Sequence, residues 1–87
     1  MAAALQIWSV TFTRSFDNLP AKARAQIERH VDEMGSRLAS FAHKRLTGRK
    51  EFKLRVGNYR VLYEFDAEAG RIYLHYVGDR KEIYKSS

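Results

Sequence analysis

The segment FKLRVGNYRVLY, residues 52–63, decides the fold of this 87-residue chain. On either side of Gly57-Asn58, apolar residues alternate with others, which is the period-two pattern of a strand with one buried face. A Gly-Asn pair between two such runs is typical of a tight hairpin turn. We therefore predict antiparallel strands at 51–56 and 58–65. The alternation places the cations of both strands on the same face of this hairpin: Lys53, Arg55 and Arg60.

The flanking segments complete a single α+β domain spanning residues 1–87. Residues 4–12 are rich in β-branched and aromatic side chains and predict a strand. A short helical turn, capped by Thr13 or Ser15, is expected next, followed by an amphipathic helix that ends near residue 40. A last strand is expected at 71–77. The predicted order is β-α-α-β-β-β: a mainly antiparallel four-stranded sheet with two helices on one face, leaving the other face for the cations.

The composition points to an anionic partner. Sixteen Lys and Arg against ten Asp and Glu give a net charge of +6, and an excess of basic residues favours RNA, DNA or an acidic protein segment. The chain has no cysteine, which excludes a disulfide framework, a thiolate metal site and a Cys nucleophile. The three histidines show no metal-ligand spacing. We therefore expect no metal or other cofactor. Without a signal-peptide pattern or a long apolar run, we expect no membrane association and a cytoplasmic location.

Two stretches, RLTGRKEFKLRVGNYRVLYEF at 45–65 and IYLHYVGDRKEIY at 72–84, resemble the RelE/ParE superfamily of bacterial toxins from type II toxin–antitoxin modules. The resemblance is strong over residues 44–84; over 4–40 only the strand–helix–helix layout agrees. The RelE branch implies a ribosome-dependent mRNA interferase. The ParE branch implies a poison of DNA gyrase that lacks the basic catalytic set. Both branches imply a cognate antitoxin that forms a hetero-oligomer with the toxin.

By matching position, the RelE pattern implies a set of catalytic residues: Lys53, Arg55, Arg60, Arg80 and Tyr84. Other basic residues are expected to bind RNA around them: Lys44, Arg45, Arg49, Lys50 and Lys81. Arg55 and Arg60 are assigned to phosphate binding, because a guanidinium matches phosphate oxygens in a bidentate fork. Lys53 is the candidate general base, Arg80 contacts the leaving side, and Tyr84 stacks on a base or orients the 2′-OH. The chain departs from the pattern at Glu51, where a basic residue is expected.

Three functions remain open from the sequence. The first is an endoribonuclease that acts on ribosome-bound mRNA, the second a gyrase inhibitor of the same fold, and the third a non-catalytic module that binds RNA or protein. Purely structural roles are also open for single residues. Arg60 is a candidate to pair with Glu64 or Asp79, and His75 reads as a packed or hydrogen-bonded histidine at the edge of the core.

Overall fold

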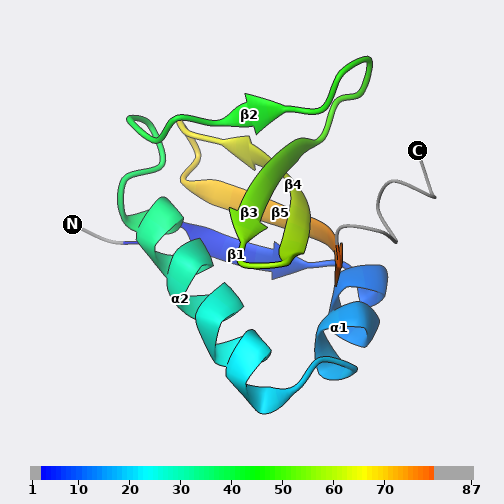
Figure 1. The fold of residues 1–87 in the computed structure, drawn as a ribbon. Coiled ribbons are helices and arrows are strands. Elements are labelled where there is room, and N and C mark those ends of the chain that lie inside the picture. Colours follow the sequence, from blue (N-terminus) through cyan, green and yellow to red (C-terminus); the bar gives the residue numbers. More distant parts are fainter. Residues whose placement is uncertain (1–2, 80–87) are drawn as a thin grey trace.

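The computed structural model describes residues 3–79, which form one mixed sheet with two helices on one of its faces (Figure 1). The sheet order is β1-β5-β4-β3-β2, with β1 parallel to β5 and the other neighbours antiparallel. The predicted α+β class is confirmed, with a fifth strand added to the expected four. The elements are β1 Leu5–Trp8, α1 Val10–Asp17, α2 Ala21–Ser36, β2 Lys44–Arg45, β3 Phe52–Val56, β4 Tyr59–Asp66 and β5 Arg71–Asp79.

The central hairpin forms as the sequence predicts. β3 pairs with β4 from Phe52↔Tyr63 to Val56↔Tyr59, which leaves Gly57-Asn58 as the two-residue turn. Gly57 has φ +59°, and Asn58 does not have a positive φ. This combination is expected of a type II′ turn, in which glycine occupies the first central position. The turn fixes the register, and the register decides which side chains share a face.

The first strand is shorter than predicted. The expected strand at 4–12 ends at Trp8, and α1 begins at Val10. Ser9 causes the switch, because its backbone is extended and its Oγ accepts the amide hydrogen of Phe12 at 2.9 Å. Ser9, and neither Thr13 nor Ser15, is therefore the N-cap. The apolar residues after Ser9 serve a helix face, with Phe12 buried against the sheet.

The second helix is also shorter than predicted, and it leads to a strand that the sequence did not indicate. α2 ends at Ser36 rather than near residue 40. Gly35 lies inside this helix, where a Cβ would contact Ile72 at 3.4 Å and Ala4 at 3.5 Å, so a glycine suits the close approach of helix and sheet. The basic connector between α2 and β3, residues 43–50, contributes β2, whose two residues pair with β3. Within residues 3–79, no helix is both long and apolar enough to cross a membrane.

An aromatic cluster around the buried Tyr63 ties the segment after α2 to the sheet. The Tyr63 hydroxyl is 2.6 Å from Nδ1 of His43, whose Nε2 is 2.8 Å from the Leu38 carbonyl oxygen. Because a carbonyl only accepts, Nε2 donates to it and Nδ1 accepts from Tyr63. His43 also stacks on Phe65 at 3.7 Å between ring centroids. Burial raises the pKa of the Tyr63 phenol well above its ordinary value.

Both helices cover the same apolar face of the sheet. The core joins Phe12, Phe16, Ile27, Val31, Met34 and Leu38 to Leu54, Val56, Val61, Tyr63, Ile72, Leu74 and Val77. Because side chains alternate along a strand, the residues between these core positions point away from the helices. We call that side the outer face; on β3 and β4 it is defined by Lys53, Arg55, Arg60, Leu62 and Glu64.

Candidate nucleic-acid interface

The strand register places four cations on the outer face as two like-charged pairs. Arg55 lies directly opposite Arg60 across β3 and β4, and Lys44 lies opposite Lys53 across β2 and β3. Directly opposed residues have Cβ atoms about 4.5–5.5 Å apart, and like charges at that separation destabilise a sheet. The arrangement therefore costs stability unless an anion lies between the pairs. The sequence prediction that Lys53, Arg55 and Arg60 share a face is consistent with this register.

Arg60 lies at the centre of this group and is buried. Its exposed fraction is 7%, and Nη1 is a buried atom with no hydrogen-bond partner. The ion pairs seen among residues 3–79 are Arg37–Glu33, Arg49–Glu51 and His75–Glu64, and none of them includes a cation of the two pairs. Buried donors in proteins nearly always have a partner. An unpartnered guanidinium nitrogen beside three further cations is a feature expected of an anion site.

Three other predicted RNA-binding residues do not belong to the two like-charged pairs. Arg45 pairs in register with Phe52 and its guanidinium sits 4.9 Å from the centre of that ring, so it does not share the face of Lys44. Arg49 donates to the Glu51 carboxylate at 2.9 Å. That hydrogen bond is the largest cause that holds the pKa of Glu51 below its ordinary value. Lys50 is exposed in the turn before β3.

The remaining predicted site residues, Arg80, Lys81 and Tyr84, lie outside the described residues, so their roles stay predictions. Among residues 3–79 there is no group of three or more His, Asp or Glu side chains that could hold a metal ion. The candidate site is thus described here by Lys44, Lys53, Arg55 and Arg60.

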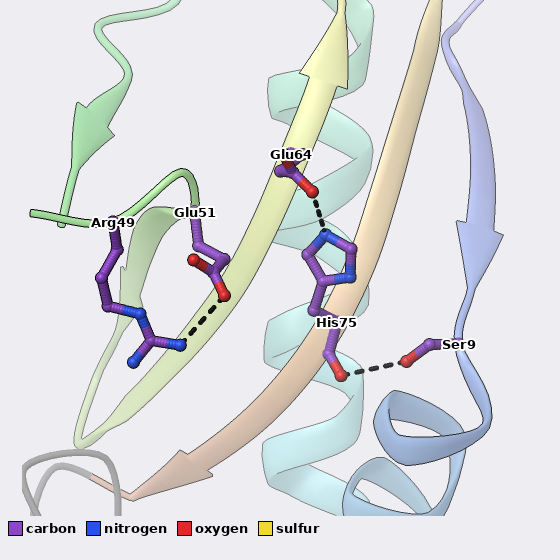
Figure 2. Close-up of polar contacts among 5 residues, drawn as sticks. All are labelled: Ser9, Arg49, Glu51, Glu64 and His75. Carbon is purple, nitrogen blue, oxygen red and sulfur yellow. Dashed lines mark hydrogen bonds and ion pairs between the residues drawn. The ribbon is translucent and has the colours of Figure 1, made fainter. Parts of the chain in front are cut away.

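Sequence reasoning missed one pair on the outer face. Nε2 of His75 lies 2.8 Å from a carboxylate oxygen of Glu64 across β4 and β5 (Figure 2). The carboxylate therefore engages His75, and the alternative in which Glu64 pairs with Arg60 is wrong. The expectation of a hydrogen-bonded histidine at position 75 is met. The alternation of β4 could have indicated that Glu64 shares the face of Arg60, but the position of His75 depends on a bulge that the sequence does not reveal.

A family model, in agreement with the fold, defines the class of protein: toxins of type II toxin–antitoxin modules in the RelE/ParE superfamily. Residues 7–84 match the family described as ParE toxin of type II toxin–antitoxin system, parDE. The chain belongs to this family. The resemblance seen in the sequence is thereby confirmed at the level of the superfamily.

Solved structures with the same fold include three relatives of low sequence identity. The RelBE2 toxin–antitoxin complex of Mycobacterium tuberculosis has a TM-score of 0.75 at 23% identity, covering 92% of this chain and 94% of the other. The RelB–RelE complex of Methanococcus jannaschii has a TM-score of 0.71 at 24% identity, covering 92% of this chain and 96% of the other. The isolated E. coli RelE toxin has a TM-score of 0.75 at 19% identity, covering 97% of this chain and 94% of the other. No curated protein sequence matches the chain significantly.

Proposed function

We propose that this toxin cleaves mRNA on the ribosome, and that the cations of the outer face grip the scissile phosphodiester. The observation that supports this best is Arg60, a buried guanidinium whose Nη1 lacks a partner and which faces Arg55. A phosphate between the two guanidiniums would satisfy the free donor and relieve the repulsion of the opposed pair. A surface used only for solubility would not bury one of its cations.

The chemistry needs no group beyond the RNA and the protein. RNA carries its own nucleophile, the 2′-OH, whose oxygen attacks the adjacent phosphorus while the bond from phosphorus to the 5′-oxygen breaks. The phosphorane transition state carries extra negative charge on its non-bridging oxygens. Arg55 and Arg60 stabilise that charge, and one preorganised donor of this kind is worth about 3–4 kcal/mol. Arg80 and Tyr84 complete the set at the leaving group and the base, as the family pattern implies.

A cognate antitoxin is the proposed regulator. The solved relatives from Mycobacterium tuberculosis and Methanococcus jannaschii are toxin–antitoxin complexes, and this chain keeps their fold over most of its length. An antitoxin that places carboxylates against the outer face would neutralise the two like-charged pairs and exclude RNA. We place toxin, antitoxin, ribosome and mRNA together in the cytoplasm.

Two observations favour a second function, inhibition of DNA gyrase. The family model that matches the chain is named for ParE toxins, and the ParE branch implies a gyrase poison rather than a nuclease. Glu51 also departs from the basic residue that the RelE pattern expects. Against this, the cations Lys53, Arg55 and Arg60 are all retained, which favours the nuclease.

Expression of the toxin in a bacterial host, followed by mapping of mRNA 5′ ends, separates the two functions. New 5′ ends clustered within codons of translated messages, and absent when translation initiation is blocked, are expected. Arg60→Ala and Arg80→Ala should each abolish them. Arg29→Ala is the matched control, because Arg29 is exposed on α2. Growth arrest with broken DNA and intact mRNA would instead establish gyrase as the target.

A further inference from the structure

The outer face contains a second polar group whose role the cations do not explain. Glu64 on β4 and His75 on β5 point toward one another, and their side chains are 43% and 37% exposed (Figure 2). Neither belongs to the site residues that the family pattern implies. A half-exposed histidine held by a carboxylate, on the same face as a row of phosphate-binding cations, is a candidate for proton transfer.

A β-bulge fixes His75 in place. Leu62 pairs with Tyr76 and Tyr63 with Leu74, so His75 is an extra residue of β5 with no partner on β4. Its carbonyl oxygen instead accepts a hydrogen bond from Ser9 Oγ at 3.0 Å (Figure 2). Bulges redirect a side chain, and they are common beside active sites. The N-cap of α1 thus also anchors the backbone that carries the imidazole.

The carboxylate selects the tautomer of His75. Glu64 only accepts, so the hydrogen of neutral His75 lies on Nε2 and the lone pair on Nδ1. Within residues 3–79, Nδ1 has no hydrogen-bond partner. It is therefore a base that is unoccupied and oriented, and an imidazole exchanges protons near neutral pH. Lys53, the candidate base from the sequence, must keep its proton if it binds phosphate, so it is less suited to that task.

The spacing between His75 on β5 and the cations on β3 leaves room for one nucleotide. Tyr76, the next residue, lies in the same row as Leu62 and Lys53. Two strand spacings of about 4.8 Å put the Cα atoms of β3 and β5 roughly 10 Å apart. Side chains reaching inward from both strands would meet a single phosphodiester and its ribose.

Other charged groups face His75 from the surrounding elements. Glu64 faces it from β4, Lys53 lies on β3, and Glu51 lies just before β3 in an ion pair with Arg49. Arg49 is the main cause of the lowered pKa of Glu51, and the charge of His75 contributes less. The other neighbours that can titrate are Tyr73 and Tyr76 on β5 itself, whereas β1 places the apolar Ile7 opposite Tyr73. Glu64 is the partner in direct contact.

We propose that His75 is the general base of the cleavage and that Glu64 is its positioning residue; this rests on the proposed nuclease function. Nδ1 takes the proton of the 2′-OH as the 2′-oxygen forms its bond to phosphorus. The 5′-oxygen leaves with the electron pair of its broken bond and takes a proton from solvent. His75 then returns its proton to solvent, so the products are a 2′,3′-cyclic phosphate and a 5′-hydroxyl with no net change in protons.

The test is the single-turnover cleavage rate of mRNA on purified programmed ribosomes, measured from pH 5.5 to 8.5. The wild-type rate should rise with pH through the titration of an imidazole and then level off. His75→Ala should lower the plateau about 100-fold or more and remove this rise, and added imidazole should restore part of the rate. Glu64→Gln should keep the rise but lower the plateau by a smaller factor than His75→Ala, because the imidazole remains and loses only the carboxylate that orients it.

The matched control is His30→Ala, since His30 is exposed on α2 and contacts only its own helix, at the Gln26 carbonyl. It should leave the rate and its pH dependence unchanged. If the wild type and His75→Ala cleave at the same rate with the same pH dependence, while Arg60→Ala is inactive, the role of His75 is refuted and the nuclease function stands. If the wild type itself leaves mRNA intact, both proposals fail.

Discussion

Replacing Arg60 with methionine should make the free toxin more stable while abolishing its activity. Methionine keeps the unbranched apolar stem of the side chain and removes the charged head. In the free toxin that head has a buried Nη1 without a partner and lies opposite Arg55. We therefore expect Arg60 to favour an anion-bound state at the expense of the stability of the free fold.

The size of the effect follows from two contributions. A buried donor without a partner costs about 1–3 kcal/mol, and a directly opposed like-charge pair costs roughly 0.2–1 kcal/mol. We expect Arg60→Met to raise the free energy of unfolding by about 1–2 kcal/mol, after some loss of shape complementarity. For a domain of this size each kcal/mol moves Tm by about 4–8 °C. The variant should therefore melt roughly 5–15 °C above the wild type.

Thermal unfolding of the purified toxin, followed by circular dichroism, measures this directly. Inorganic phosphate should raise the Tm of the wild type, because an anion that binds only the folded state stabilises it, and it should raise the Tm of Arg60→Met less. Arg29→Met, on the exposed face of α2, should stay within about 0.5 kcal/mol of the wild type. A Tm for Arg60→Met well below that of the wild type would show that the guanidinium is satisfied in the fold, and the anion-site reasoning would be wrong.

Three further changes test other parts of the structure. Ser9→Ala should lower the free energy of unfolding by about 1–2 kcal/mol in urea titrations, since it removes the cap of α1 and the partner of the His75 carbonyl; no loss would contradict this double role. Tyr63→Phe should cost about 1–2 kcal/mol at pH 7 by unpairing Nδ1 of His43. Burial raises the pKa of the folded Tyr63 phenol. The stabilising contribution of Tyr63 is therefore complete below pH 10 and falls above pH 10 by about 1.4 kcal/mol per pH unit. The wild type should thus lose stability between pH 10 and 11 faster than Tyr63→Phe. Lys44→Gln should reduce the slope of log affinity against log salt for single-stranded RNA by about 0.7, the loss of one phosphate contact; an unchanged slope would remove Lys44 from the interface.

The sequence predicts best where the interactions are local. Alternation over 52–63 and a two-residue turn determine β3, β4 and their register, and the register alone brings Arg55 and Arg60 together. The parts that were wrong depend on the cap at Ser9 and on contacts between segments distant in the sequence. Residues 10–12 have strand-forming side chains, yet the hydrogen bonds of Ser9 turn them into a helix. β2 is too short to leave a period-two pattern, and it exists only because β3 offers an edge.

In the candidate site, too, some residues could be assigned from the sequence and others could not. A periodic strand places its cations on one face, so Lys53, Arg55 and Arg60 could be assigned from spacing. Arg45 and Arg49 could not, because a charge count does not show which side of the sheet a residue of the connector occupies or which acid it meets. The Glu64–His75 contact depends on one extra residue in β5, and a bulge of that kind leaves no periodic signal in the sequence.

The like-charged pairs explain why RNA and an antitoxin would exclude one another. Each opposed pair costs stability that a bridging anion would recover, so we expect phosphate and carboxylate groups to compete for the same four cations. Because Arg60 is only 7% exposed, little of its guanidinium is open to a ligand, and we expect RNA and an antitoxin to compete for it. On the proposed mechanism, an antitoxin need not distort the toxin to inhibit it, because a carboxylate bound at Arg60 would occupy the group proposed to stabilise the transition state. Its affinity for Arg60→Met should fall together with the affinity for RNA, whereas an antitoxin that acts only by wrapping the helices would bind that variant as tightly as the wild type.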